Sequence, residues 1–500
     1  MKILSAAQIR EADSYTINNE PIASIDLMER ASLGFVNCFV QQIGNTNPVN
    51  VFCGTGNNGG DGLAIARMLM KENYSVKTFV ISNNGNGSED FQINFERLSI
   101  VSSVNDIKNP ADIPEIQEGE IVIDAIFGSG LTRPLEGLYK EVINKINDSR
   151  AGKVVAVDIA SGLFADKHHD KGAIIKADYT ISFQVPKLAF LLPENEEYVG
   201  DFSIVDIGLD NNFIENLESP YTLLTYNSAK GLLKSRKKYG HKGEYGKALV
   251  VAGSKGKMGA AILCCRAALR TGVGLITAHI PKNCWPVIQS VVHEAMASID
   301  DHEDYFSEAK GIEVFDVLGV GPGLGTEEAT IKGFEDLLSN YSKPMVLDAD
   351  ALNILAKKPK LKDKIPKNSI LTPHPKEFER FAGSYKDDFE RLELQKETST
   401  KLGVYILLKG AHSSVSTPEG QIFFNSTGNS GMATGGSGDV LTGMLTALVA
   451  QKYPPLEATL LGVYLHGLAG DLAAQKYGKE AMLPSDLIEN ISQAYLHLQA

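Results

Sequence analysis

The chain has 500 residues, of which 43% are hydrophobic and 22% are charged, and its formal net charge is −13. This length favours two domains, and the composition is typical of a folded α/β protein rather than a disordered one. The negative charge argues against nucleic acid or an anionic membrane surface as a partner, so we expect neither.

The five cysteines show neither a CxxC pair nor a Cys/His cluster with zinc spacing, which is typical of a reduced compartment. Charge appears too early in the first ten residues for a secretory signal, and no run of about 18 apolar residues predicts a membrane span. We therefore expect a cytoplasmic protein.

The chain opens with helical patterns over residues 5–43, and a short apolar strand follows at Val49–Cys53. The glycine-rich stretch 54–62 comes next and leads into an apolar helical pattern. Strand, glycine-rich loop and helix form the order of a Rossmann-like nucleotide-binding unit. The spacing is not GxGxxG, however, and Asn57 and Asn58 add donors and acceptors that could bind a ligand or a cation. The alternative is a loop that only turns the chain.

Two further strands of the first half end in polar groups. The strand at Ile121–Phe127 is interrupted only by Asp124 and leads into the glycine-bearing loop 128–134, and the next strand, Val154–Asp158, ends in a carboxylate. In open α/β sheets, ligands bind beyond the carboxyl ends of the strands. Each Asp alone could be a helix cap, but several polar features at one edge favour a binding site.

Strands are also expected at 179–183 and 202–206, after which the pattern breaks near Ser219 and Pro220. We therefore place a domain boundary there, giving domains 1–218 and 219–500. In the second half, strands and helices alternate, which predicts a parallel sheet covered by helices on both faces. The strands expected there are 247–252, 275–280, 314–320, 344–350, one that begins at Ile370 and has His374 at its end, and 404–408, followed by a hairpin over 414–424.

The stretch Asn429–Gly443 is rich in glycine and leads into an apolar helical pattern. The N–H groups of Gly435, Gly436 and Gly438 would lie free at a helix N-terminus, where unpaired donors and the helix dipole attract anions. Asp439 would repel a phosphate there unless it takes a proton from a hydroxyl that attacks the phosphate. The pattern thus predicts phosphoryl transfer with Asp439 as base, and a simple tight connection is the alternative.

Together these motifs resemble the bifunctional NAD(P)H-hydrate repair enzymes over essentially the whole chain. The motifs similar to the epimerase domain are Gly56–Gly62, Asp124, Gly128–Pro134 and Asp158–Gly162. The motifs similar to the dehydratase domain are His241–Gly243, Val251–Ser254, Gly321–Gly325, Asp348–Leu352, Thr372–Glu377, Lys409–Gly410 and Gly435–Leu441. The resemblance implies an α/β fold class throughout, with a Rossmann-like α/β/α epimerase domain followed by a ribokinase-like α/β domain.

The resemblance also implies a reaction. NADH and NADPH slowly add water across the nicotinamide ring, which gives R and S hydrates. The epimerase domain would interconvert the two hydrates. The dehydratase domain would remove water from the S hydrate with ADP or ATP, giving AMP or ADP and phosphate. The sequence does not decide between ADP and ATP. K⁺ is the expected cofactor of the epimerase domain, and Mg²⁺ is expected to accompany the nucleotide.

Site residues follow from the same resemblance. Asp158 is the expected acid/base residue of epimerisation and Asp439 the base of dehydration, while Asn58, Asp124 and Ser161 resemble the potassium ligands. The expected hydrate-binding residues are Asn57, Asn58, Gly59, Gly60, Asp61, Gly128, Ser129, Gly130, Leu131, Thr132, Arg133, Pro134, Tyr139, Gly259, Gly323 and His374. The expected nucleotide-binding residues are Lys409, Gly410, Ala411, His412, Ser413, Asn429, Gly435, Gly436, Ser437 and Gly438.

Two other interpretations compete with this one. A kinase for a vitamin precursor or sugar could share the ribokinase-like fold and the Gly-Ser-Gly-Asp stretch, but such kinases do not usually carry the N-terminal domain. Relatives of the N-terminal domain also serve as dimerising scaffolds in RNA-decapping factors. The presence of Asn58, Asp124 and Asp158 and the acidic chain argue against that role. We expect a homo-oligomer of a size that the sequence does not give.

Overall fold

A computed structural model describes residues 1–20, 22–44, 47–82, 87–169 and 171–499. The chain divides into two compact units. The first is Met1–Tyr221 with Asp387–Phe389, and the second is Thr222–Lys386 with Glu390–Ala500. The limits 1–218 and 219–500 remain a prediction for the two functional domains.

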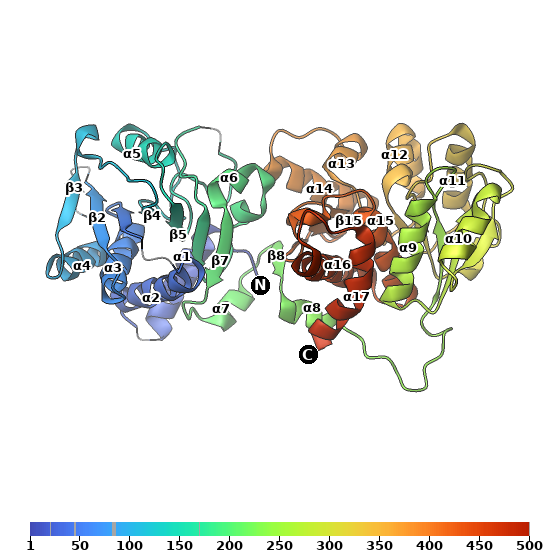
Figure 1. The fold of residues 1–500 in the computed structure, drawn as a ribbon, viewed down its shortest axis with the longest axis horizontal. Coiled ribbons are helices and arrows are strands. Elements are labelled where there is room, and N and C mark those ends of the chain that lie inside the picture. Colours follow the sequence, from blue (N-terminus) through green and yellow to red (C-terminus); the bar gives the residue numbers. More distant parts are fainter. Residues whose placement is uncertain (21, 45–46, 83–86, 170, 500) are drawn as a thin grey trace. The chain divides into compact units, whose positions relative to one another are not determined.

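The first unit is built on a seven-stranded parallel sheet with the strand order β3-β2-β1-β4-β5-β6-β7. Helices α2, α3 and α4 lie along one face of this sheet and α5 along the other (Figure 1). The strands are β1 (Val49–Cys53), β2 (Val76–Ile81), β3 (Val104–Ile107), β4 (Ile121–Ala125), β5 (Lys153–Val157), β6 (Tyr179–Phe183) and β7 (Asp201–Val205). The helices are α1 (Ala6–Asn19), α2 (Ser24–Gln42), α3 (Asn57–Lys71), α4 (Glu89–Ser99), α5 (Gly137–Asn147), α6 (Glu196–Val199) and α7 (Asn211–Asn216).

Strands β1 and β4 form the centre of the first sheet, and all their residues are buried. A parallel strand that is covered on both faces needs apolar side chains on both, which explains the continuous apolar run of each strand. The one charged side chain in either strand, Asp124, lies in β4 with no exposed surface. Its burial therefore calls for a local partner.

Helix α3 begins earlier than the sequence predicts. The stretch 54–62 was expected to be a loop, but its second half, from Asn57 onward, forms the first turns of the helix. Glycine is unfavourable inside a helix by about 1 kcal/mol relative to alanine, which is why the sequence predicts a loop. The tertiary structure nevertheless requires glycine at position 59, because a Cβ there would lie 1.9 Å from the carbonyl oxygen of Gly54.

The second unit contains a ten-stranded sheet with the order β11-β10-β9-β12-β13-β14-β15-β16-β17-β8. The run from β11 to β15 is parallel, and β16 and β17 form the expected antiparallel hairpin. The strands are β8 (Tyr221–Leu224), β9 (Lys247–Val251), β10 (Leu275–Ile280), β11 (Met296–Ile299), β12 (Val317–Val320), β13 (Met345–Leu347), β14 (Ile370–Leu371), β15 (Tyr405–Leu408), β16 (Ser414–Ser416) and β17 (Ile422–Asn425). The helices are α8 (Tyr226–Leu232), α9 (Met258–Thr271), α10 (Trp285–Val291), α11 (Glu328–Asn340), α12 (Ala349–Lys357), α13 (Pro375–Ala382), α14 (Asp388–Leu402), α15 (Ser437–Ala450), α16 (Pro455–Tyr477) and α17 (Pro484–Gln499).

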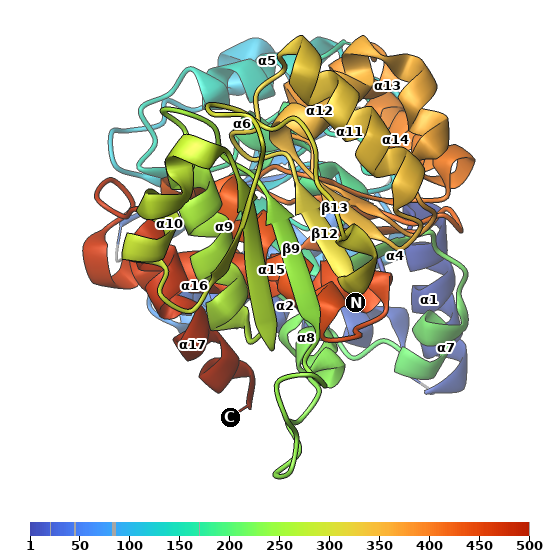
Figure 2. The ribbon, with the colours of Figure 1, turned by 90° about the vertical axis from the view of Figure 1, so that its right-hand side faces the viewer.

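Alternate residues of β9 contribute to two separate cores. Ala248 and Val250 pack with α9 and α15, whereas Leu249 and Val251 pack with α11, α12 and α13. Figure 2 shows β9, β12 and β13 side by side, with α9 and α10 on one side and α11, α12 and α13 on the other. Successive side chains of a strand point to opposite faces, so this alternation gives a three-layer α/β/α unit.

Three predicted strands are shorter in the structure. The strand expected over 121–127 ends at Ala125, that over 314–320 begins at Val317, and that over 344–350 spans only Met345–Leu347. The missing residues form a bend after Ala125, the end of the 3₁₀ helix Ile312–Val314 with the irregular residues after it, and the start of α12 at Ala349. Apolar composition alone does not set these limits, because the same residues also pack well in a turn that is covered by other elements.

Candidate active sites

The first unit has a cavity of about 480 Å³ beyond the carboxyl ends of its strands. The wall brings together expected residues from three places in the chain: the start of α3, the loop after β4 and the end of β5. The expected residues in this wall are Asn57, Asn58, Asp61, Gly128, Ser129, Gly130, Leu131, Thr132, Arg133 and Asp158. This edge of the sheet is where an open α/β fold binds its ligand.

Four of the hydrate-binding residues expected in the first unit do not line this cavity: Gly59, Gly60, Pro134 and Tyr139. Tyr139 packs its ring edge-on against Phe127, with the ring centroids 4.7 Å apart, and Phe127 does line the cavity. Tyr139 thus supports the wall from behind.

Asp158 adopts the left-handed backbone conformation, with φ 66°, directly after β5. The side chain of Lys187 has no exposed surface, and its Nζ donates to Asp158 Oδ1, to Ser182 Oγ at 2.7 Å and to the carbonyl of Phe183 at 3.3 Å. Asp158 Oδ1 also accepts from Ser182 Oγ at 3.3 Å and from the N–H of Phe183 at 3.2 Å. These bonds hold the carboxylate of Asp158 in one orientation.

Every hydrogen bond to the Asp158 carboxylate from the described part of the chain ends on Oδ1. Oδ2 is therefore left for a ligand in the cavity. A non-glycine residue with positive φ is uncommon, and such strain is found most often at functional sites. Lys187 has no motif that would have identified it from the sequence.

Two more carboxyl groups, those of Asp13 and Asp61, line the same cavity. Burial, followed by the negative charge of Asp158, raises the pKa of Asp13 to about 6, and Lys187 opposes this shift. Burial and the carboxylates of Asp158, Asp13 and Asp90 raise the pKa of Asp61 well above its usual range. The sequence analysis did not single out Asp13, because a charged residue on an amphipathic helix normally faces water.

A polar cluster lies beside this cavity at Asp124, Ser161 and the backbone of Phe127. The two oxygens of Asp124 accept from the N–H and the hydroxyl of Ser161 at 2.7 and 2.6 Å. The hydroxyl of Ser161 also lies 3.2 Å from the carbonyl oxygen of Phe127 and accepts from the N–H of that residue at 2.8 Å. Burial raises the pKa of Asp124 to about 6, although hydrogen bonds from Ser161 and Ile126 oppose the shift.

Asn58 lies close to this cluster, because a Cβ added at Gly128 would be 3.4 Å from its side-chain atoms. The amide nitrogen of Asn58 is buried and has no hydrogen-bond partner among the described residues. An unpaired buried N–H donor is costly unless an acceptor on a bound molecule pairs with it. Carboxylate, hydroxyl, amide and carbonyl oxygens suit a hard cation.

In the second unit, helix α15 begins at Ser437, directly after Gly436, which has φ 103°. No side chain caps this helix. Among the described residues, none accepts a hydrogen bond from the N–H groups of Gly435, Gly436 or Gly438. Imidazole Nε2 of buried His466 donates to the carbonyl of Ser437 at 2.9 Å and so fixes the first turn. The result is the uncapped, positively polarised helix end that the sequence predicts.

Asp439 lies in this first helical turn, near an ion pair that it does not join. Lys409 Nζ donates to Asp348 Oδ1 at 2.8 Å, and Thr442 Oγ1 donates to Asp348 Oδ2 at 2.8 Å. Burial and the charge of Asp348 raise the pKa of Asp439 to about 6, while Lys409 opposes the shift. A carboxylate with a pKa near neutrality is suited to take a proton and release it again.

The other expected residues of the second site lie at the start of α9, after β12, before α13, after β15 and at the start of α15. A Cβ at Gly438 would lie 3.2 Å from Lys409 Nζ, and a Cβ at Gly323 would lie 3.1 Å from Cβ of Ala260, next to Gly259. Glycines 259, 410 and 435 have open space where a side chain would be. These positions therefore leave room for a ligand close to the backbone.

Several expected residues also have a structural role. His374 caps helix α13 by accepting from the N–H of Lys376 at 3.2 Å, and burial lowers the pKa of its imidazole. Asn429 donates to Asp471 Oδ1 at 2.9 Å, and Ser413 Oγ donates to the carbonyl of Gly410 at 3.1 Å. His412 Nδ1 lies 3.4 Å from the carbonyl oxygen of Asn425, and Ala411 is exposed. These contacts order the loops that surround the helix end.

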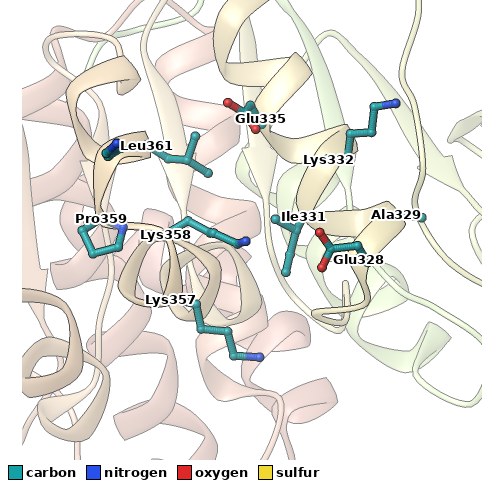
Figure 3. Close-up of a pocket in the computed structure, with 10 residues that line it drawn as sticks. Glu328, Ala329, Ile331, Lys332, Glu335, Lys357, Lys358, Pro359 and Leu361 are labelled. Carbon is teal, nitrogen blue, oxygen red and sulfur yellow. The ribbon is translucent and has the colours of Figure 1, made fainter.

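A further cavity, of about 570 Å³, lies between α11 and the 3₁₀ helix Pro359–Lys364 (Figure 3). Its lining includes Lys332 and Glu335 on α11 and Lys357 at the end of α12. None of the residues expected from the sequence lines it. No helix in the described ranges combines the length and apolar character that a membrane crossing needs.

Comparison with known proteins matches both halves of the chain. Residues 248–493 match the family described as NAD(P)H-hydrate dehydratase, and residues 24–189 match the family of YjeF-related protein N-termini. The bifunctional NAD(P)H-hydrate repair enzyme Nnr of Moorella thermoacetica is 36% identical and covers 100% of this chain and 97% of its own length. The enzyme of the same name from Thermofilum pendens is 34% identical, with 99% and 96% covered.

Among solved structures, a ribokinase-like superfamily protein from Enterococcus faecalis has a TM-score of 0.50 and 24% sequence identity. The match covers 57% of this chain and 98% of the Enterococcus faecalis protein. This likeness concerns the fold alone, and it confirms a ribokinase-like fold for the second half of the chain. Together with the parallel sheet of the first unit, it confirms the expected α/β fold class.

Proposed function

We propose that this chain, which belongs to the bifunctional NAD(P)H-hydrate repair enzymes, repairs hydrated nicotinamide nucleotides at two sites, one in each compact unit. The cavity of the first unit interconverts the R and S hydrates of NADH and NADPH. The N-terminus of α15 in the second unit binds ADP or ATP and drives loss of water from the S hydrate. The proposal rests on the position of one acidic side chain in each unit. Asp158 lies after β5 in the wall of the first cavity, and Asp439 lies in the first turn of α15.

In the first unit, Asp158 is the acid/base residue of epimerisation. The carboxylate opens into the cavity through Oδ2, and the bonds of Oδ1 to Lys187 and to the backbone of Phe183 hold it in one orientation. Asn57, Asn58, Asp61 and residues 128–133 surround the remaining space and bind the hydrate. Gly59, Gly60 and Pro134 shape the backbone of these loops, and Tyr139 supports Phe127.

In the second unit, Asp439 removes the proton from the hydroxyl of the S hydrate as that oxygen attacks the terminal phosphorus of the nucleotide. Phosphate then leaves in place of hydroxide, which is a poor leaving group. The free N–H groups of Gly435, Gly436 and Gly438 stabilise the charge on the transferred phosphoryl group. Lys409 lies beside Gly438 and adds a positive charge.

The remaining expected residues position the two ligands of this site. Gly259, Gly323 and His374 contact the hydrate. Lys409–Ser413 and Asn429–Gly438 contact the nucleotide. The open space at Gly259, Gly410 and Gly435 supports these roles, because a ligand can approach the backbone there.

Two ions complete the proposal. The oxygen donors of Asn58, Asp124 and Ser161 fit K⁺, which would hold the loop after β4 against the turn after β5. Mg²⁺ usually binds one or two carboxylates together with substrate phosphates rather than a complete protein cage. Asp348 and Asp439, at the end of β13 and the start of α15, are carboxylates that fit this pattern.

The protein's surroundings are also part of the proposal. The formal charge of −13 argues against binding to nucleic acid or to an anionic membrane. A cytoplasmic location and a homo-oligomeric state follow from the resemblance and the cysteine content. Light scattering after gel filtration measures the oligomeric state.

A coupled assay tests the proposed function. Mixed NADH hydrates are incubated with the enzyme, and the absorbance of recovered NADH is followed with ADP, with ATP or with no nucleotide. If only the S hydrate is converted to NADH, dehydration is active. If both hydrates are converted to NADH, epimerisation is active too. No recovery with either nucleotide would contradict the assignment, and phosphorylation of a sugar or vitamin precursor would favour a kinase.

A further inference from the structure

The cavity of the first unit is lined by three acidic groups, one of which is bonded directly to a buried lysine. Asp13, Asp61 and Asp158 all line it. The ammonium group of Lys187 bonds directly to one of them, Asp158. Within the described ranges, the carboxyl group of Asp13 takes part in no hydrogen bond. It therefore faces the cavity without a partner from the protein.

Asp13 is held in this wall by a fixed helix rather than by a loop. The N–H of Ala6, at the start of α1, donates to Asp166 Oδ2 at 2.9 Å, and Thr16 Oγ1 accepts from the N–H of Asp210 at 3.0 Å. Arg10, one turn before Asp13, lines the same cavity, and its guanidinium lies 3.4 Å from where a Cβ of Gly130 would be. This helix thus presents a carboxyl group and a guanidinium group to the loop that the hydrate is proposed to contact.

The charges that surround Asp13 decide its protonation. They are Arg10 on α1, Asp61 on α3, Asp158 after β5, Asp166 in the loop that follows and Lys187 before the next 3₁₀ helix. Burial and the nearby Asp158 favour the neutral acid at position 13, and its pKa is raised to about 6. Asp61 has a hydrogen-bond partner in Ser32, so it is less free to react than Asp13.

Inversion of the hydrate needs proton transfer on two faces of one ring carbon. That carbon carries both a hydroxyl and the ring nitrogen, so the hydroxyl can leave from one face and water can add to the other. A single carboxylate serves one face well. A pair of carboxyl groups with different environments, one neutral and one ionised, can serve both.

We propose that Asp13 is the second catalytic residue of epimerisation and acts on one face of the hydrate ring while Asp158 acts on the other. This inference rests on the epimerase site proposed above. It is carried by the position of the two groups, which reach the same cavity from different elements, α1 and the end of β5.

The proton and electron balance of the reaction is complete with water as the only co-reactant. The lone pair of the ring nitrogen forms a C=N bond as the C–O bond breaks, and Asp13 gives its proton to the departing hydroxyl, which leaves as water. A water molecule then adds to the opposite face of the planar cation, and the C=N electrons return to nitrogen. Asp158 removes the extra proton from the new hydroxyl. Reversal of these steps, or proton exchange between the two carboxyl groups, restores the starting state.

The test is the rate of R-to-S exchange in full-length Asp13→Asn, measured against pH. We expect a fall of about 10²-fold or more, which is within the usual range for a general acid. Asp13 must carry a proton to act as the acid, so kcat/KM of the wild-type enzyme should fall as the pH rises through about 6. Asp13→Asn should lose this fall, and Asp13→Glu should keep it.

Matched variants separate the possible outcomes. Glu11→Gln makes the matching carboxyl-to-amide change at an exposed position of the same helix and should epimerise at the wild-type rate. Exchange in Asp13→Asn within about twofold of wild type, or a slow variant whose rate still falls as the pH rises through about 6, would overturn the inference. Asp158→Asn tests the site itself. If it exchanges normally, the site assignment fails, whereas a slow Asp158→Asn with a normal Asp13→Asn contradicts only the inference.

Discussion

The two proposed active sites combine an aspartate with a lysine in different ways. In the first unit, Lys187 bonds directly to Asp158. In the second, Lys409 bonds to Asp348 instead, and Asp439 has a pKa raised to about 6. The same two residue types thus give one carboxylate that is bonded directly to a lysine, and another that lies beside a lysine–aspartate pair and has a pKa raised to about 6. The difference shows that the partner of the lysine, rather than its presence, sets the role of the aspartate.

The largest expected effect is that of Asp439→Asn on dehydration. The variant lacks the base, so nucleotide-driven loss of water from the S hydrate should fall by about 10²–10⁴-fold. Epimerisation should be unchanged, because the cavity of the first unit does not contain this residue. NADH recovery and R-to-S exchange on one sample measure both effects, and dehydration near the wild-type rate would remove Asp439 from its role.

A control on folding uses the same variant. Burial raises the pKa of Asp439 in the folded protein, so the folded state binds this proton more tightly than the unfolded state. Its stabilising contribution is present at low pH and is lost as the pH rises from about 4 to about 6. Asparagine does not ionise, so the variant should melt no earlier than wild type at pH 8. A lower melting temperature there would show that the activity loss reflects misfolding.

Asp158→Asn is expected to give the next largest effect. Epimerisation should slow by about 10²-fold or more, because the amide cannot accept the proton, while dehydration of pure S hydrate should continue at the wild-type rate. The alternative is that Asp158 only shapes the turn after β5, in which case the variant would melt slightly earlier and epimerise normally. Exchange rate and melting temperature, measured together, distinguish these roles.

The ionisation of Asp439 should also appear in the pH dependence of dehydration. The base must be ionised to act, so below about pH 6 the rate should fall by about tenfold per pH unit. Above pH 7 it should level off. A rate of dehydration that does not change between pH 5 and pH 7 would contradict the assignment, because it would place the proton acceptor elsewhere.

A smaller effect is expected from Ser161→Ala. This change removes the hydroxyl that lies between Asp124 and the backbone of Phe127, so it should weaken K⁺ binding by about 10–100-fold. The rise in melting temperature on addition of KCl, compared with NaCl, reports binding without relying on activity. An equal response of the variant and the wild-type protein to K⁺ would exclude Ser161 as a ligand.

The smallest effect is expected from separating the two units. A fragment of residues 1–221 should fold and epimerise at close to the rate of the full chain, because the first unit has its own core. It should not end earlier, since Lys2 Nζ donates to the carbonyl of Leu217 at 2.5 Å and Ser219 Oγ donates to that of Ile3 at 2.6 Å. An inactive fragment, with an active full chain, would contradict independent function.

The sequence alone determined those features that depend on local pattern. The apolar run Val49–Cys53 gave the limits of β1, and the glycine-rich stretch before Asp439 predicted an uncapped helix end. The sequence also predicted that residues 57–61, 128–133 and Asp158 lie at one edge of the sheet. Each of these segments follows a strand, and the carboxyl ends of parallel strands lie at the same edge.

The tertiary structure decided what depends on contacts between distant residues. The bond of Lys187 to Asp158 joins residues 29 positions apart, and the bond of Lys409 to Asp348 joins residues 61 apart, so no local pattern contains either pair. The start of α3 at Asn57 and the direction of Asp13 were also set by neighbouring elements. Local propensity favours a loop at the glycines of α3, but close packing there outweighs this preference. Local propensity also favours solvent exposure of a charged side chain such as Asp13, but the shape of the cavity outweighs it.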